Sequence, residues 1–240
     1  MPTADPAAQR TLLELADVDR AADAARHRRA TLPALAVIAE GAARIDDLSG
    51  RLVLAQTEVG DLDRAARKLD DEIDSVRARA DRDRERLASG AVPAKELENL
   101  QREVESLGRR QGTLEDDALE LMERREAADA AMAQAQAELD AAMAEVDGAT
   151  TSRDGQFVTI DGELAELAGK REGLVTGIPQ DVLALYERIR SSGKVAAGAL
   201  MGDRCGACRM ALDRQTLEEI RTAALDSVQR CPECGAILVR

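Results

Sequence analysis

The sequence predicts a mainly α protein, in which a long antiparallel coiled-coil hairpin precedes a small C-terminal unit with short antiparallel strands. Three observations predict this fold class. Apolar residues follow a heptad repeat over two long segments, a short helix-breaking segment separates these two, and all four cysteines lie C-terminal to residue 204. The elements are justified below in chain order.

The composition agrees with long helices that pack along narrow seams. Hydrophobic residues make up 45% of the chain and charged residues 33%, but aromatic residues only 1%. Large aromatic side chains contribute much of the buried area of wide cores. The composition therefore disfavours a β-sandwich, a TIM barrel and a doubly wound α/β domain.

The first long helix is predicted between Pro33 and Gly90. Steps of three and four residues separate successive apolar positions there, which is the coiled-coil signature. The positions are Leu35, Ile38, Ala42, Ile45, Leu48, Leu52, Ala55, Val59, Leu62, Ala66, Leu69, Ile73, Val76, Ala80 and Leu87.

A second stripe of the same kind begins after Pro93 and reaches Ala149. Its positions include Leu97, Leu100, Leu114, Leu121, Ala128, Ala135, Leu139, Ala142 and Val146. The connection at 89–93 is short, and a short connection makes two helices antiparallel neighbours. We therefore expect a hairpin with its tip near 89–93, although a straight parallel dimer would use the same heptads.

A joint in the hairpin is expected near 31–33 and 149–157. Pro33 interrupts the first arm, and the heptad phase of the second arm slips between Ala149 and Phe157, where Gly148 and Gly155 lie in a cluster of small and polar residues. The two breaks share one level if Leu87 faces Leu97. The predicted organisation is a hairpin over 1–178, a short connecting helix over 179–194 and a separate small unit over 195–240.

The small unit carries two CxxC motifs, Cys205-Gly-Ala-Cys208 and Cys231-Pro-Glu-Cys234. Each motif presents two thiolates from one tight turn, and structural zinc needs four such ligands in a tetrahedron. The pattern predicts a zinc ribbon that binds one structural Zn²⁺ through Cys205, Cys208, Cys231 and Cys234. An iron site and a redox pair are weaker alternatives, since a thioredoxin-like pair needs a βαβ context.

The charge of the chain directs attention to one locally basic stretch, residues 186–209. The net charge is −13, so the chain as a whole is not expected to bind nucleic acid without sequence preference. An acidic protein partner or a nucleic acid could contact the basic stretch, unless its charges are merely scattered over a solvated surface. The candidate partner-binding residues are Tyr186, Arg188, Arg190, Lys194, Arg204 and Arg209.

No catalytic residues are predicted. The single histidine, His27, lies among arginines and is read as a solvated helix residue, and no Walker loop, nucleophile elbow or HExxH motif occurs. We therefore expect no enzyme activity and no small-molecule substrate. The N-terminus does not resemble a signal peptide and no apolar run is long enough to span a membrane, so a cytoplasmic protein without membrane contact is expected, as a monomer or weak dimer.

The hairpin pattern, the YERIR helix at 186–190 and the closing CPECGAILVR at 231–240 together resemble the bacterial coiled-coil proteins with a C-terminal four-cysteine zinc ribbon. The resemblance implies that the four cysteines bind zinc. It also implies an interaction protein, because some members are described as chaperones or adaptors for the nitrogen-type sigma factor, for flagellar or type III secretion components, and for messenger RNA. Ala236 stands where the family often has a basic residue, which weakens a nucleic-acid role for the ribbon.

We therefore expect a non-enzymatic adaptor whose coiled-coil rod presents a zinc ribbon to a protein partner. Binding of RNA or DNA through the ribbon and residues 186–209 is the alternative.

Overall fold

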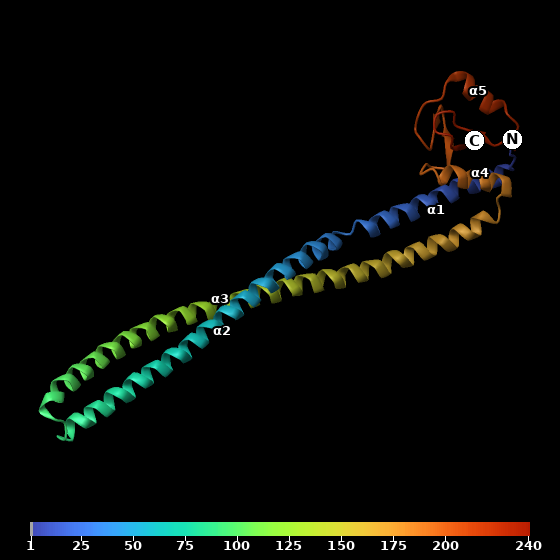
Figure 1. Ribbon diagram of the computed structural model, residues 1–240. Helices are drawn as coiled ribbons and strands as arrows, with labels where there is room; N and C mark the ends of the chain where they lie inside the picture. The colour runs from blue at the N-terminus through green and yellow to red at the C-terminus, as the bar shows by residue number, and fades with distance from the viewer. Residues whose placement is uncertain (1) are drawn as a thin grey trace. The chain divides into compact units, whose positions relative to one another are not determined.

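The computed structural model describes residues 2–240, apart from the side chain of Ala94. Five helices are labelled α1 to α5 (Figure 1): Pro6–Ala30, Pro33–Ala88, Ala94–Val175, Gln180–Arg190 and Arg214–Thr222. Four short strands, β1 to β4, follow α4 and enclose α5: Ala197–Met201, Arg204–Cys205, Gln229–Arg230 and Ile237–Val239. The predicted fold class is confirmed.

The chain divides into two compact units. One unit is Ala36–Ala149, and the other combines the N-terminal segment up to Leu35 with Thr150–Arg240. This division differs from the predicted boundaries at 178 and 195, because the start of the chain packs against the C-terminal sheet. Each unit is described separately.

The unit Ala36–Ala149 is an antiparallel pair of helices, formed by parts of α2 and α3. In its seam, Leu48 and Leu52 pack against Ala135, Leu139 and Ala142. Ion pairs flank the seam, and the partners of Arg44 and Arg51 run in the opposite direction along α3: Arg44 pairs with Glu145 (3.7 Å) and Arg51 with Glu138 (3.1 Å). The antiparallel hairpin predicted from the short connection at 89–93 is thus confirmed for this unit.

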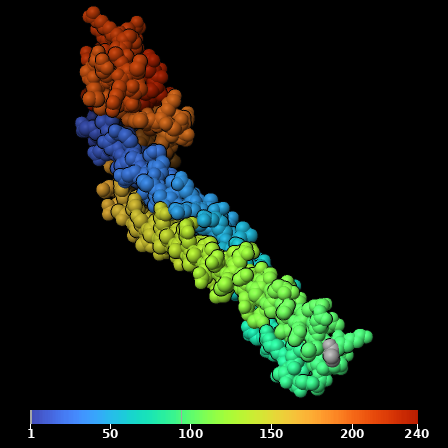
Figure 2. Space-filling view, turned by 90° about the vertical axis from the view of Figure 1, so that its left-hand side faces the viewer, coloured from blue at the N-terminus to red at the C-terminus, as the bar shows by residue number. Residues whose placement is uncertain are grey.

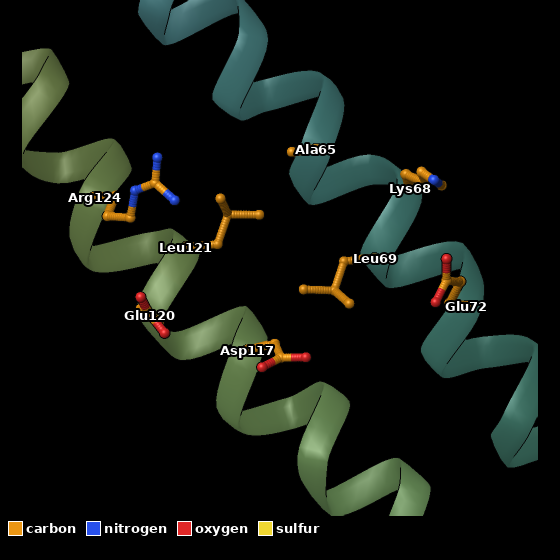
Figure 3. Close-up of a pocket in the computed structure, with 8 residues that line it drawn as sticks. All are labelled: Ala65, Lys68, Leu69, Glu72, Asp117, Glu120, Leu121 and Arg124. Carbon is orange, nitrogen blue, oxygen red and sulfur yellow. The ribbon is translucent and has the colours of Figure 1, made fainter.

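The seam is one side-chain layer wide, as the scarcity of aromatic residues indicated. Figure 3 shows Leu69 and Leu121 pointing toward one another from the two helices, whereas Lys68 and Arg124 lie to the sides. A shallow hollow of about 360 Å³ opens beside these leucines, and Ala65, whose side chain is small, is one of the residues of α2 that line it. Alanines in the seam therefore leave shallow openings rather than a wide core.

In the second unit, α1 packs along the C-terminal part of α3. Ala25 and Leu32 contact Ile160 in a small buried cluster. Two salt bridges cross between the helices, from Arg28 to Glu163 (2.5 Å) and from Arg29 to Asp161 (2.9 Å).

Only one side of the predicted joint contains a break in the helix. The first arm is interrupted between Ala30 and Pro33, as expected, but α3 continues without a break through residues 149–157. Glycine in a helix costs only about 1 kcal/mol relative to alanine. A long helix with packed neighbours tolerates Gly148 and Gly155, so these glycines are weaker signals than Pro33.

The strands form one sheet in the order β2-β1-β4-β3. The β1–β2 and β3–β4 pairs are antiparallel, as predicted, whereas β1 and β4 are parallel. The last residue, Arg240, closes the unit: its guanidinium donates hydrogen bonds to the carbonyls of Ile220, Ala223 and Ala224 at the end of α5.

The sheet, α1 and α4 share one core. Leu12 and Leu15 of α1, Val182 and Tyr186 of α4, and Ile237 of β4 are all buried in it. In Figure 2 the dark blue start of the chain lies directly against the orange and red C-terminal residues. The ribbon is therefore built onto the helices rather than separated from them.

The N-terminal segment adds backbone contacts to the same assembly. The N–H of Ala4 donates to the carbonyl of Asp226 (2.8 Å), and Thr3 pairs with Ser227 in an antiparallel bridge. The buried amide of Gln9 donates to the carbonyls of Ala4 and Leu225, both at 2.9 Å. These bonds explain why the first residues belong to the unit that contains the sheet.

Within residues 2–240, none of the helices combines the length and the apolar character that crossing a membrane requires.

Candidate metal centre and the surface around it

The four cysteines predicted as metal ligands meet at one point of the sheet. Cys205 ends β2 and Cys231 follows β3, and Cys208 and Cys234 come three residues after each. All four sulfur atoms lie within 4.8 Å of one another, with 3.9 Å between Cys205 and Cys234 and 3.9 Å between Cys208 and Cys231. With zinc–sulfur bonds of about 2.3 Å, a tetrahedron has sulfur–sulfur separations of about 3.8 Å. The donor set thus fits a zinc ion.

The two cysteine turns have the same backbone pattern. The residue after the second cysteine donates its N–H to the carbonyl of the first, from Arg209 to Cys205 (2.7 Å) and from Gly235 to Cys231 (2.9 Å). Both donors have left-handed backbone geometry, with φ of 80° at Gly235 and 63° at Arg209. Glycine adopts this geometry without strain, whereas a residue with a side chain does not.

The protein controls how readily the thiols lose their protons. Burial raises the pKa of Cys205 and raises that of Cys234 to about 12, whereas the backbone N–H of Met210 lowers the pKa of Cys208. A bound metal cation would favour the thiolate form of all four. Leu212, Ile220 and Leu238 complete a small apolar cluster around the centre.

Close backbone contact joins the first cysteine turn to β1. The N–H of Gly206 donates to the carbonyl of Ala199 (2.8 Å). A Cβ atom at Gly198 would lie 2.5 Å from the nitrogen of Ala207, and one at Gly206 would lie 2.6 Å from the oxygen of Ala199. Nothing in the local sequence distinguishes Gly198, because its contact depends on how β1 packs against the first cysteine turn.

Two of the predicted partner-binding residues are held by contacts within the chain: Tyr186 is buried and Arg190 is half-buried. Tyr186 is 1% exposed, and its hydroxyl donates a hydrogen bond to the carboxylate of Asp19 (2.8 Å). Nε of Arg190 lies 3.0 Å from the same carboxylate, and Nε of Arg171 donates to it at 2.9 Å. Tyr186 and Arg190 therefore hold α4 against α1 and α3, and we remove them from the predicted contact surface.

This network also changes the acidity of the tyrosine. Burial raises the pKa of Tyr186, and the hydrogen bond to the negative Asp19 carboxylate raises it further. Asp19 itself is 5% exposed. Sequence reasoning did not single out Asp19, because nothing in the local sequence distinguishes it from the many solvated acids of the helices.

The other four predicted residues are exposed: Arg188, Lys194, Arg204 and Arg209. In the part of the chain that the structure describes, none of them forms a salt bridge. They do not make one patch. Lys194 and Arg209 line neighbouring hollows beside α1 and β1, whereas Arg188 lines a different hollow beside β3.

The comparison with known families agrees with this architecture. The sequence pattern of the CT398-like coiled coil hairpin domain matches residues 15–194, and that of the C4-type zinc ribbon domain matches residues 204–238. The chain belongs to the CT398-like coiled-coil hairpin family. It is a zinc-binding coiled-coil protein, as the two domains and the clustered cysteines indicate.

Two mycobacterial relatives of this CT398-like chain align with most of its length. It is 41% identical to the uncharacterized protein Rv2229c of Mycobacterium tuberculosis (strain ATCC 25618 / H37Rv) over 234 residues, which cover 98% of this chain and 96% of that protein. It is 32% identical to ML1638 of Mycobacterium leprae over 187 residues, or 78% of this chain and 81% of that protein.

Solved structures show the same fold. A protein from Mycobacterium smegmatis aligns with a TM-score of 0.86 and 39% identity over 99% of this chain and 100% of its own. CT398 of Chlamydia trachomatis aligns with a TM-score of 0.55 at 15% identity, covering 97% of this chain and 94% of its own. At that identity, the likeness to CT398 concerns the fold alone.

Proposed function

We propose that this protein is a non-enzymatic adaptor, in which the zinc ribbon and the helices packed against it form a docking surface for a macromolecular partner. The observation that carries the proposal is the closed four-cysteine centre. Four thiolates fill every position of a tetrahedral zinc ion, so no position remains for water or a substrate. The zinc ion then has a structural role, with one ion per chain.

The contacts around Asp19 support the same proposal. A carboxylate that accepts hydrogen bonds from α3 and α4 while belonging to α1 fixes the three helices on which the sheet is built. A surface that is rigid before binding loses less conformational entropy when it binds. The ribbon is thus held as a preformed surface, and its exposed unpaired cations are available to a partner.

An experiment with purified components tests the proposal. The full-length zinc-loaded chain is used to capture partners from lysate of its host, and each captured candidate is then purified and titrated by calorimetry. We expect at least one candidate to bind the wild-type chain and to lose binding to Cys231→Ser, which removes one zinc ligand. Equal binding to both would show that the ribbon has no part in docking.

Nucleic-acid binding is the second candidate function, favoured by the unpaired charges of Arg188, Lys194, Arg204 and Arg209. Binding of this kind releases counterions, so the logarithm of its affinity falls linearly with the logarithm of the salt concentration. Gel retardation of single-stranded RNA and duplex DNA is measured at two salt concentrations, about 20 mM and about 200 mM. Retardation that is lost at the higher concentration would support nucleic-acid binding. If no nucleic acid is retarded at the lower concentration, this candidate is excluded.

A further inference from the structure

A groove runs between α1 and the first strand of the ribbon. We define the α1–β1 groove by Leu13 and Arg20 of α1, Val195 just before β1, Met201 at the end of β1, and Arg209 of the first cysteine turn. Its volume is about 490 Å³. A smaller hollow of about 130 Å³ shares Arg20 and Val195 with it and extends to Lys194.

Two apolar side chains that line the groove, Val195 and Met201, are left exposed by this chain. Val195 is 39% exposed and Met201 is 67% exposed, both high for their residue types. Methionine and arginine are enriched in the centres of protein–protein interfaces, and the flexible methionine side chain adapts to different apolar surfaces. Gly198 and the first cysteine turn, whose backbones lie in close contact, also line the groove.

Arg209 is the feature that points to an external ligand. It occupies the left-handed position that glycine fills in the second cysteine turn, with φ of 63°. Within residues 2–240 its side chain forms neither a salt bridge nor a hydrogen bond. A strained residue persists where the surrounding structure imposes it, and such residues gather at functional sites. The chain thus keeps an arginine in a strained position without using its side chain.

Positive charge is in excess around the groove when the side chains that pair within the chain are set aside. Asp17 pairs with Arg20, and Asp23 pairs with Arg26 at 2.6 Å. Asp19 is already shared by two arginines. Two unpaired cations remain, Lys194 in the smaller hollow and Arg209 in the groove. The apolar Val195 lines both hollows, and Met201 lines the groove.

We propose that the α1–β1 groove binds a short segment of a protein partner that combines apolar and acidic side chains. The guanidinium of Arg209 pairs with a carboxylate of that segment, and Met201 and Val195 pack against an apolar side chain. The charge complementarity favours an acidic peptide. This inference rests on the proposed adaptor function and specifies the chemistry of its partner.

Peptide selection tests the proposal without knowledge of the natural partner. A displayed library of random peptides is selected against the zinc-loaded full-length chain, and the enriched peptides are synthesised with a fluorescent label for anisotropy titrations. We expect enriched peptides that contain both acidic and apolar residues. Their affinity should fall about tenfold or more in Arg209→Gly and in Met201→Asp.

The variants separate a lost contact from a lost fold. Glycine suits the left-handed geometry at position 209, so Arg209→Gly should keep its zinc content and should melt at the same or a higher temperature. Arg188→Glu is the matched control, because Arg188 is also exposed and unpaired but lines another hollow. Its effect on peptide affinity should stay within about twofold.

Each other outcome has a definite meaning. The affinity of the peptides could instead be unchanged by Arg209→Gly and Met201→Asp but lowered by Arg188→Glu. The peptides would then bind another face, which overturns the groove proposal but is compatible with the adaptor function. If selection enriches no peptide, the groove is overturned, while the capture experiment with Cys231→Ser decides the adaptor function separately. If a single-stranded RNA oligonucleotide binds and Arg209→Gly abolishes that binding, the occupant is nucleic acid and the proposal is wrong.

Discussion

Asp19 shows how one side chain determines what its neighbours can do. Locally basic sequence placed Tyr186 and Arg190 on a contact surface, but the carboxylate that binds them lies 167 residues away from Tyr186 in the chain. The density of Arg and Lys is visible in the sequence, whereas the partner of each charge depends on the tertiary fold. This is why the zinc ligands could be proposed from spacing alone, but the surface residues could not be sorted into paired and free.

Replacing Asp19 should destabilise the unit that contains the sheet. Removing one partner of a buried ion pair leaves the other charges uncompensated, which costs about 3 kcal/mol. We expect Asp19→Ala to lower the free energy of unfolding by that amount in urea titrations. Asp23→Ala is the control, since the side chain of Asp23 is 64% exposed, and its effect should be much smaller. Equal effects would show that the network around Asp19 contributes no more than a surface pair.

Tyr186 should make stability fall at alkaline pH. Its pKa in the folded state lies above its ordinary value of 10.0. The folded state therefore holds the proton more tightly than the unfolded state, and its advantage is complete below pH 10 and declines as the pH rises above 10. Each pH unit in that window should lower the stability by about 1.4 kcal/mol.

The chain contains a single tyrosine and no tryptophan, so the ultraviolet absorbance of the ionised phenol reports this group alone. We expect that absorbance to appear together with a partial loss of helical circular dichroism, from the unit that contains Tyr186. In Tyr186→Phe the stability should decline less steeply as the pH rises above 10. If the tyrosine ionises near its ordinary pKa of 10.0 while the helices remain intact, its hydroxyl is not buried as described.

At the scale of elements, the heptad repeat predicted α2 and α3 well because side-chain periodicity is a local property. The short connection also gave their antiparallel order. The sequence did not reveal that β1 and β4 are parallel or that the first residues pair with Ser227. Those pairings join segments far apart in sequence, and short strands of two to five residues carry too few side chains to specify their neighbours.

Two helical glycines should respond in opposite directions to the same substitution. Nothing lies near a Cβ atom built at Gly112, so Gly112→Ala should stabilise the coiled coil by up to about 1 kcal/mol through helix propensity. A Cβ atom at Gly41 would overlap the side chain of Val146. Gly41→Ala should therefore destabilise the coiled coil by about 1 kcal/mol or more, because the cost of overpacking exceeds the gain in helix propensity. Thermal melts of the two variants check the signs, and stabilisation by both would mean that Val146 can move aside.

For the whole molecule, zinc and the helix seams stabilise different parts of the chain. The cluster around the cysteines contains few large apolar side chains. A ribbon of about 45 residues rarely folds on its core alone. Binding of zinc to such a unit supplies about 10 kcal/mol. The seam of Ala36–Ala149 contains none of the four cysteines. Loss of the metal should therefore unfold the ribbon and leave the coiled coil folded.

Cys205→Ser and Cys231→Ser should each fail to retain one equivalent of zinc, as measured by elemental analysis of the purified protein. Far-ultraviolet circular dichroism should keep most of its helical signal, while amide exchange becomes fast in β1 and β4. Val239→Ala is a suitable control, because it removes apolar contacts of β4 without removing a ligand, and it should retain zinc. One full zinc equivalent in either cysteine variant would refute the four-thiolate centre. Collapse of the helical signal would instead mean that the ribbon stabilises the coiled coil.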